Sequence, residues 1–172
     1  MKTICDSGPL MALAKLNLLP LLKKLYGEVC ITEGVYYESV TQGKNRGYED
    51  AQTIELFSNK QGWKPREIDS KEIDEELTRL NLDRGEIECI SLAEEHQNSL
   101  VLLDDEYARS ASRTRDISVK GTLGILVDAF QKDYIDLEEL DFYLEQISNR
   151  DDIWISEELC EKVIKQVKKD CR

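Results

Sequence analysis

The sequence contains few of the residues that build zinc sites and histidine-based active sites. It has a single histidine, His96, and its five cysteines are scattered and never occur in CxxC spacing. A structural zinc site needs four clustered Cys or His ligands, and a Ser-His-Asp triad needs a histidine between its two partners. We therefore expect neither kind of site. Several cysteines lie within apolar runs, which indicates reduced, buried thiols and a cytoplasmic location.

Long apolar runs are also missing. The most apolar stretch, Leu10–Leu25, is broken by Asn17, Pro20 and three lysines. It is too polar for a membrane span and lacks the organisation of a signal peptide. We expect no membrane contact, and the length of 172 residues suits one domain with a single core.

The chain has fewer basic residues than acidic residues. The chain has 23 Lys and Arg residues against 35 Asp and Glu residues, which gives a net charge of −12. Classical nucleic-acid-binding proteins are usually basic, so a polyanionic substrate would here need metal ions and a local basic patch. One basic cluster comprises Arg109, Arg113, Arg115 and Lys120. Arg109 and Arg113 share a helix face at i, i+4 spacing, and they either bind phosphate or pair with neighbouring acids.

Strand-like apolar runs alternate with helical periodicity along the chain. These runs are Lys2–Asp6, Glu28–Ile31, Leu100–Asp104 and Ile117–Val119. Strands separated by helices favour right-handed crossover connections and a parallel sheet, and therefore an α/β fold.

Capping residues and glycines predict where the intervening segments are helical. The expected helices include one capped by Thr32 and running through Val40, one capped by Ser70 and ending at Leu80, and one from Asp83 to about Gln97. Gly43–Gly47 is expected to be a loop. The tail Ile135–Lys169 predicts two amphipathic helices, whose apolar stripes are Leu137, Leu140, Leu144 and Ile147 on the first and Leu159, Val163, Ile164 and Val167 on the second.

Single carboxylates stand where strands end or helices begin. Asp6 and Asp104 close apolar strands, Glu86 lies in the first turn of a helix, and Glu38 lies on another helix. Because the carboxyl ends of parallel strands share one crevice, we expect Asp6, Glu86 and Asp104 to converge there. Glu38 is expected beside them. Clustered carboxylates cannot all stay ionised without a cation, and a hard divalent metal ion suits oxygen ligands.

Each of these acids also has a purely structural interpretation. Asp6 can cap a helix, Asp83 and Glu86 have the spacing of a capping box, and Asp104 can favour a helix N-terminus through the helix dipole. Glu38 can be a solvated helical side chain. The spacing alone leaves both interpretations open.

Several short motifs occur in a characteristic order. They are Ile4–Leu10; Glu28–Thr32 followed by Val35–Glu38; Leu82–Glu86 running into Ile90–Ala93; Leu102–Asp105 with Arg109; and Gly121–Gly124 with the ending Trp154–Leu159. Together they resemble the PIN-domain family, and within it the VapC-like branch. The resemblance covers nearly the whole chain and is weakest from Gly43 to Arg79.

The resemblance implies a three-layer α/β/α fold with a central, mostly parallel sheet. Residues 1–134 would be the nuclease domain and residues 135–172 a C-terminal helical extension. It also implies a Mg²⁺- or Mn²⁺-dependent ribonuclease, commonly the toxin of a toxin–antitoxin pair, that forms a homodimer and is inhibited by a small antitoxin protein. By position, the catalytic residues are Asp6, Glu38, Glu86 and Asp104, the metal ligands are Asp6, Glu86 and Asp104 with Asp105 as an accessory, and the substrate-binding residues are Ser7, Arg109 and Arg113.

Other functions remain open at this point. A PIN fold can lose catalysis and act as a protein-interaction scaffold, and a nuclease can also work without an antitoxin. A small metal-dependent phosphatase on a similar sheet is a third possibility, although no Asp-x-Asp pair follows the first strand.

Overall fold

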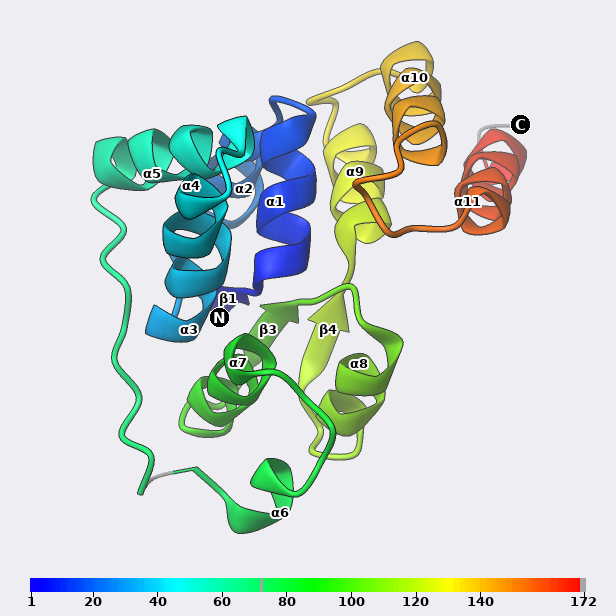
Figure 1. Ribbon diagram of the computed structural model, residues 1–172. Helices are drawn as coiled ribbons and strands as arrows, with labels where there is room; N and C mark the ends of the chain where they lie inside the picture. Colours follow the sequence, from blue (N-terminus) through cyan, green and yellow to red (C-terminus); the bar gives the residue numbers. More distant parts are fainter. Residues whose placement is uncertain (72, 171–172) are drawn as a thin grey trace. The chain divides into compact units, whose positions relative to one another are not determined.

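The computed structural model describes residues 1–71 and 73–170 and divides into two compact units, Met1–Gly121 and Thr122–Arg172. The first unit is built on a four-stranded sheet with the strand order β2-β1-β3-β4 (Figure 1). All of its neighbouring strands pair in parallel. The strands are β1 (Lys2–Cys5), β2 (Val29–Cys30), β3 (Ser99–Leu102) and β4 (Ser118–Lys120). The predicted α/β fold with a parallel sheet is therefore confirmed.

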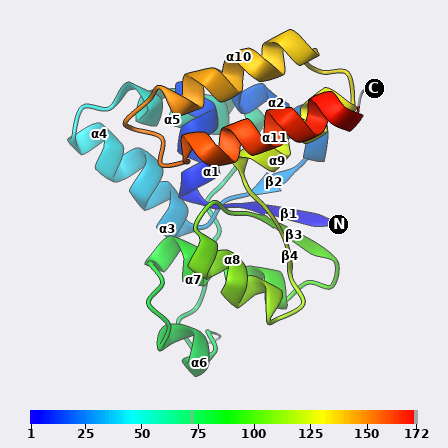
Figure 2. The ribbon, with the colours of Figure 1, turned by 90° about the vertical axis from the view of Figure 1, so that its right-hand side faces the viewer.

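Helices cover both faces of this sheet, which explains why its central strands β1 and β3 are almost entirely buried. Ile4 of β1 and Val101 of β3 are completely buried, as expected for a parallel sheet enclosed on two sides. On one face lie α1 (Ser7–Lys15) and α2 (Leu19–Tyr26), and on the other lie α7 (Arg84–Glu94) and α8 (Glu106–Arg113) (Figures 1 and 2). The first unit is thus a three-layer α/β/α arrangement.

The helical segment after β2 is longer than predicted. Thr32 caps α3 (Glu33–Tyr36) by accepting a hydrogen bond from the Val35 N–H. The chain then continues without a break through the π-helical η1 (Tyr37–Gln42) and α4 (Gly43–Asn45). The predicted loop at Gly43–Gly47 is therefore wrong for its first three residues. A Cβ on Gly43 would lie 2.6 Å from the Cβ of Ala51 in α5 (Glu49–Gln61), so Gly43 permits close helix packing and does not end the helix.

Two other helices are shorter than predicted. The helix expected from Ser70 to Leu80 is reduced to the single turn α6 (Glu75–Thr78), which Asp74 caps through the Glu76 N–H. Glu72 of that expected helix lies outside the described residues. Helix α7 ends at Glu94, three residues early, because the chain turns toward β3 through Asn98, whose φ of 61° is left-handed.

The second unit consists of α9 (Thr122–Gln131), α10 (Leu137–Ser148) and α11 (Glu157–Asp170) (Figure 2). The two predicted tail helices are confirmed, and Leu140, Leu144 and Ile147 of the first stripe are buried. The second stripe is less buried than the first, since Leu159 is 44% exposed. In the described part of the chain, no helix is long and apolar enough to cross a membrane, and Cys5, Cys30, Cys89 and Cys160 are free thiols.

Candidate functional site

Asp6 connects the end of β1 to the start of α1 and is only 5% exposed. Its Oδ2 accepts a hydrogen bond of 3.3 Å from the Gly8 N–H, so Asp6 does cap the helix. Its Oδ1 is buried and makes no hydrogen bond of acceptable geometry among residues 1–71 and 73–170, although the Ser7 N–H lies close enough to the carboxyl to lower its pKa. Burial raises the pKa of this carboxyl well above its usual value, and the nearby charges of Asp83 and Glu86 raise it further. The capping and ligand interpretations of Asp6 are compatible, because each uses a different oxygen.

Two glycines leave space in which other carboxylates approach Asp6. A Cβ on Gly85 would lie 3.1 Å from Glu38 Oε2 and 3.3 Å from Asp6 Oδ1. A Cβ on Gly8 would lie 3.6 Å from Asp104 Oδ2 and 3.8 Å from Asp6 Oδ2. Asp6 therefore lies between Glu38 on one side and Asp104 on the other, at the N-termini of α1 and α7.

Glu38 is held in place by donors from two other helices. The Ser7 hydroxyl of α1 and the Gly85 N–H of α7 both donate hydrogen bonds to its carboxylate. Burial and the charge of Asp83 nevertheless raise the pKa of Glu38. Ser7 is itself buried, and its side chain contacts Glu38. The structure thus places Ser7 as a partner of Glu38, and it shows Glu38 to be more than a solvated surface residue.

Glu86 lies in the first turn of α7, with only 7% of its surface exposed. Its N–H donates to Asp83 Oδ1, and its Oε2 accepts from the Asp83 N–H, both at 2.9 Å. The capping box expected from the spacing is therefore present. Burial, together with the charges of Asp83, Asp105 and Glu38, raises the pKa of Glu86 to about 7. Glu86 also lines a pocket of about 680 Å³ with Asn81, Leu82, Asp83, Asp105 and Tyr107.

Asp104 follows β3 and lies next to Arg109 and Gly121. A Cβ on Gly121 would lie 2.8 Å from Asp104 Oδ1 and 3.3 Å from Arg109 Nη1, so this glycine makes room for both side chains. Asp105 caps α8 by accepting a 2.8 Å hydrogen bond from the Ala108 N–H. Asp105 thus has a structural role, and it also lines the pocket beside Glu86.

The basic cluster separates into two kinds of arginine. Arg113 pairs with Glu106 at 3.0 Å, as surface charges commonly do. Arg115, whose side chain is largely buried, pairs with Glu94 at 3.0 Å. Arg109 is different because its guanidinium and the Asp104 carboxylate lie beside the same glycine, Gly121. Its Nε is buried and makes no hydrogen bond within the described chain, although it lies 3.8 Å from Glu106. Arg109 therefore lies beside Asp104 of the acidic residues, whereas Arg113 and Arg115 pair with acids elsewhere.

Asp83 belongs to the acidic group and was not among the predicted site residues. Its charge raises the pKa of both Asp6 and Glu38, more than any other charged neighbour does. The sequence predicts Asp83 as the capping residue of this helix, from its spacing to Glu86, and this spacing predicts no further role for its carboxylate. A usable signal was present, since Asp83 directly precedes the Arg84-Gly85-Glu86 part of the third motif.

We call this site the acidic centre. All of its side chains carry carboxyl groups, and its residues are Asp6, Glu38, Asp83, Glu86 and Asp104. Among the described residues, no three His, Cys, Asp or Glu side chains already form a group that could hold a metal ion. The donor chemistry nevertheless fits a hard divalent cation, because the buried Asp6 Oδ1 makes no hydrogen bond of acceptable geometry in the described residues and Glu38 Oε2 lies beside the same Gly85.

Comparisons with known proteins identify the family of the chain. Neither a search of curated proteins nor a search of solved structures gave a match. A family model described as a PIN domain matches residues 2–169, which is nearly the whole chain and includes every residue of the acidic centre. PIN domains are generally nucleases, so a nuclease-type function follows from the match. The chain belongs to the PIN-domain family.

Proposed function

We propose that this PIN domain is a Mg²⁺- or Mn²⁺-dependent endoribonuclease of the VapC-like type, with Asp6, Glu38, Glu86 and Asp104 as its catalytic carboxylates. The observation that carries the proposal is the buried Asp6 Oδ1, which makes no hydrogen bond of acceptable geometry in the described residues. An unpaired buried carboxylate oxygen is costly, and a cation removes that cost. The charges of Asp83 and Glu86 raise the pKa of Asp6. Glu38 Oε2 and Asp6 Oδ1 both lie beside Gly85, so these acids share the need for a cation.

Each residue then has a distinct task. Asp6, Glu86 and Asp104 would hold the metal ion, with Asp105 as an accessory. Ser7 and the Gly85 N–H orient the Glu38 carboxylate. Arg109 neutralises a phosphate of the RNA, and Arg113 contributes to RNA binding once it leaves Glu106. A bound Mg²⁺ or Mn²⁺ lowers the pKa of coordinated water and neutralises charge on a phosphodiester.

Cleavage of a labelled RNA by the purified chain tests this proposal. We expect cleavage with Mg²⁺ or Mn²⁺, none with EDTA, and none by Asp6→Asn. The matched control is Glu161→Gln, which makes the same kind of change at an exposed carboxylate that pairs only with Lys165 in the described structure. Cleavage that persists in EDTA, or that Glu161→Gln abolishes equally, would rule out the acidic centre as the metal-dependent site.

The biological setting is also part of the proposal. We propose that the chain is the cytoplasmic toxin of a type II toxin–antitoxin pair, that it forms a homodimer, and that a small cognate antitoxin inhibits it. The net charge of −12 favours rapid capture of a basic partner. We further propose residues 1–134 as the nuclease domain and residues 135–172 as its helical extension. Light scattering tests the dimer, and co-expression with a neighbouring small gene tests the antitoxin.

A protein-interaction scaffold is the second candidate function. Two observations favour it: no metal-holding group of three side chains is preformed in the described residues, and the chain is strongly acidic. A scaffold would neither bind Mn²⁺ at the acidic centre nor cleave RNA, whereas the nuclease would do both. Isothermal titration with Mn²⁺ therefore separates the two functions without requiring the correct RNA sequence.

A further inference from the structure

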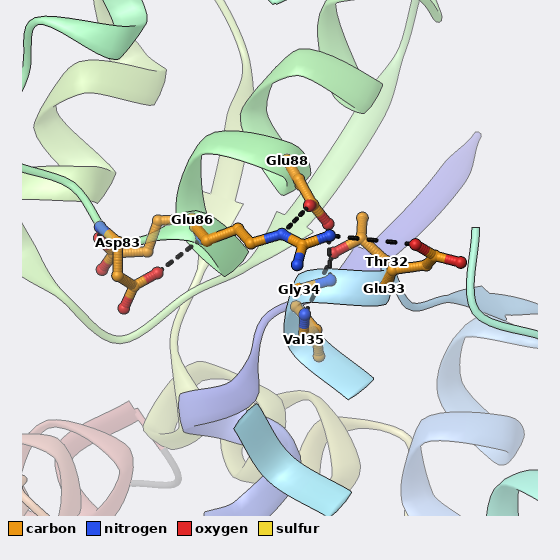
Figure 3. A network of polar contacts seen from close by, with 8 residues as sticks. Thr32, Glu33, Gly34, Val35, Asp83, Glu86 and Glu88 are labelled. Carbon is orange, nitrogen blue, oxygen red and sulfur yellow. Dashed lines mark hydrogen bonds and ion pairs between the residues drawn. The ribbon is translucent and has the colours of Figure 1, made fainter. Parts of the chain in front are cut away.

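Glu88 is a buried carboxylate of α7 that lies outside the predicted catalytic set. Only 4% of its surface is exposed. Its Oε2 accepts a 2.7 Å hydrogen bond from the Gly34 N–H in α3, and its Oε1 accepts a 2.6 Å hydrogen bond from Arg84 Nε (Figure 3). Arg84 also lies 3.9 Å from Glu33. Glu88 therefore ties the start of α3 to α7, across 54 positions of sequence.

Two glycines allow α3 and α7 to approach at this point. A Cβ on Gly34 would lie 2.9 Å from Glu88 Oε2 and 3.1 Å from Arg84 Cγ. In the opposite direction, a Cβ on Gly85 of α7 would lie 3.1 Å from Glu38 Oε2 and 3.4 Å from a Val35 methyl. Side chains of α7 thus pack against the backbone of Gly34, and side chains of α3 and η1 pack against the backbone of Gly85.

This contact leads directly to the acidic centre. Gly34 and Glu38 are four residues apart in one continuous helical segment, α3 followed by η1. Residues with this spacing lie on the same side of a helix, about one turn apart. The bond that fixes Gly34 against α7 therefore also fixes where Glu38 meets the Gly85 N–H and Asp6.

We propose that Glu88 is a positioning residue for Glu38, which sets the distance between the Glu38 and Asp6 carboxylates by holding α3 against α7 through the Gly34 N–H. The part of this proposal that concerns metal binding rests on the proposed function. Glu88 touches neither substrate nor metal in this role. Residues that support metal ligands in this indirect way typically change metal affinity about 10- to 100-fold when replaced.

Titration of Mn²⁺ into metal-free protein is the first test. Glu88→Gln keeps an oxygen for the Gly34 N–H but loses the ion pair with Arg84, whereas Glu88→Ala loses both. We expect Mn²⁺ affinity to fall in the order wild type, Gln, Ala, with about a 10-fold or larger loss for Ala. With an RNA substrate, kcat should fall in the same order while KM stays within about twofold, because Glu88 orients a ligand without binding RNA.

Glu94→Gln is the matched control for a merely structural role. Glu94 lies on the same helix and also pairs with an arginine, Arg115 at 3.0 Å, but that contact does not involve α3. We expect this variant to lower the melting temperature without changing Mn²⁺ affinity. Equal Mn²⁺ affinity in wild type, Glu88→Gln and Glu88→Ala would overturn the proposal, as would an equal loss in Glu94→Gln.

A second measurement needs neither metal nor activity. The Gly85 N–H donates to Glu38, so its amide chemical shift in metal-free protein reports where Glu38 lies. Glu38→Gln should move that shift in wild type but have little effect in the Glu88→Ala background. An unchanged effect of Glu38→Gln in both backgrounds would overturn the proposal. If wild type binds no Mn²⁺, the proposed function fails, and this double-mutant cycle still decides the role of Glu88.

Discussion

Gly85 of α7 lies so close to Glu38 of η1 that a Cβ added to the glycine would be 3.1 Å from Glu38 Oε2. The same Cβ would be 3.3 Å from Asp6 Oδ1. Position 85 thus combines a helical glycine, which costs about 1 kcal/mol of stability relative to alanine, with two carboxylates that lie against its backbone. This combination indicates a position where local stability is given up to bring the carboxylates together.

Gly85→Ala should therefore separate stability from activity. The alanine favours the helix, and the Glu38 side chain, which is only partly buried, can move by a few tenths of an ångström. We expect a change in unfolding free energy between 0 and about +1 kcal/mol, with at least about a tenfold loss of Mn²⁺ affinity. Urea denaturation and titration calorimetry measure the two effects.

Gly43→Ala provides the contrast to Gly85→Ala. The new Cβ would lie 2.6 Å from the Cβ of Ala51, where none of its nearest neighbours is a carboxylate of the acidic centre and the close atom is not the end of a flexible side chain. Forcing extra volume into a packed contact typically costs about 1–3 kcal/mol. We expect that loss in urea denaturation with Mn²⁺ affinity retained. A stabilised Gly43→Ala protein would mean that α4 does not pack on α5 as described.

Asp6→Asn should stabilise the metal-free protein. The change removes a buried charge surrounded by other acids, while the amide oxygen can still accept from the Gly8 N–H. We expect a gain in unfolding free energy on the order of 1 kcal/mol in EDTA, together with loss of cleavage. A destabilised variant would show that the Asp6 charge is already compensated in the metal-free state.

Divalent metal should raise the melting temperature of the wild type. An ion that binds only the folded acidic centre stabilises by about 2.7 kcal/mol at 100 times its dissociation constant. Differential scanning fluorimetry with millimolar Mg²⁺ or Mn²⁺ should show the rise in wild type and in Glu161→Gln, and none in Asp6→Asn. The same rise in all three proteins would place the ion elsewhere.

Stability of the metal-free protein should fall as the pH rises from about 4.5 to about 7. The pKa of Glu86 is raised from 4.5 to about 7 in the folded chain, so the folded state holds a proton over this range that the unfolded state has lost. The stability that this proton supplies is complete below pH 4.5 and disappears as the pH passes through 7. Raised pKa values at Asp6 and Glu38 act in the same direction.

Glu86→Gln isolates the contribution of Glu86 to this pH dependence. Glutamine preserves the capping box, since it also serves at that position, but it does not titrate. Urea denaturation between pH 4.5 and 8 in EDTA should show a flatter profile for Glu86→Gln than for wild type, with a difference on the order of 2 kcal/mol. Parallel profiles would mean that Glu86 is not held in an environment that favours its protonated form.

The sequence predicted features that depend on local pattern. The four strands follow from short apolar runs, and the Asp83–Glu86 capping box follows from spacing alone. Features that depend on distant contacts could not be predicted. Gly43 suggests a turn until Ala51 is seen packed against it. Glu88 has an i, i+4 signal toward Arg84, but nothing in the sequence links it to Gly34, 54 residues away.

In the continuous helical segment formed by α3, η1 and α4, the number of residues is more important for the contacts made than the identity of the exposed residues. A π-helix, with its i→i+5 hydrogen bonds, has about one more residue per turn than an α-helix. With this winding, one unbroken segment brings Glu38 to Gly85 of α7 and Gly43 to Ala51 of α5. Deleting one residue would rotate one of these contacts away from the other by about 100°. Substitutions along the exposed side of η1 are therefore easier to accommodate than an insertion or deletion of even a single codon.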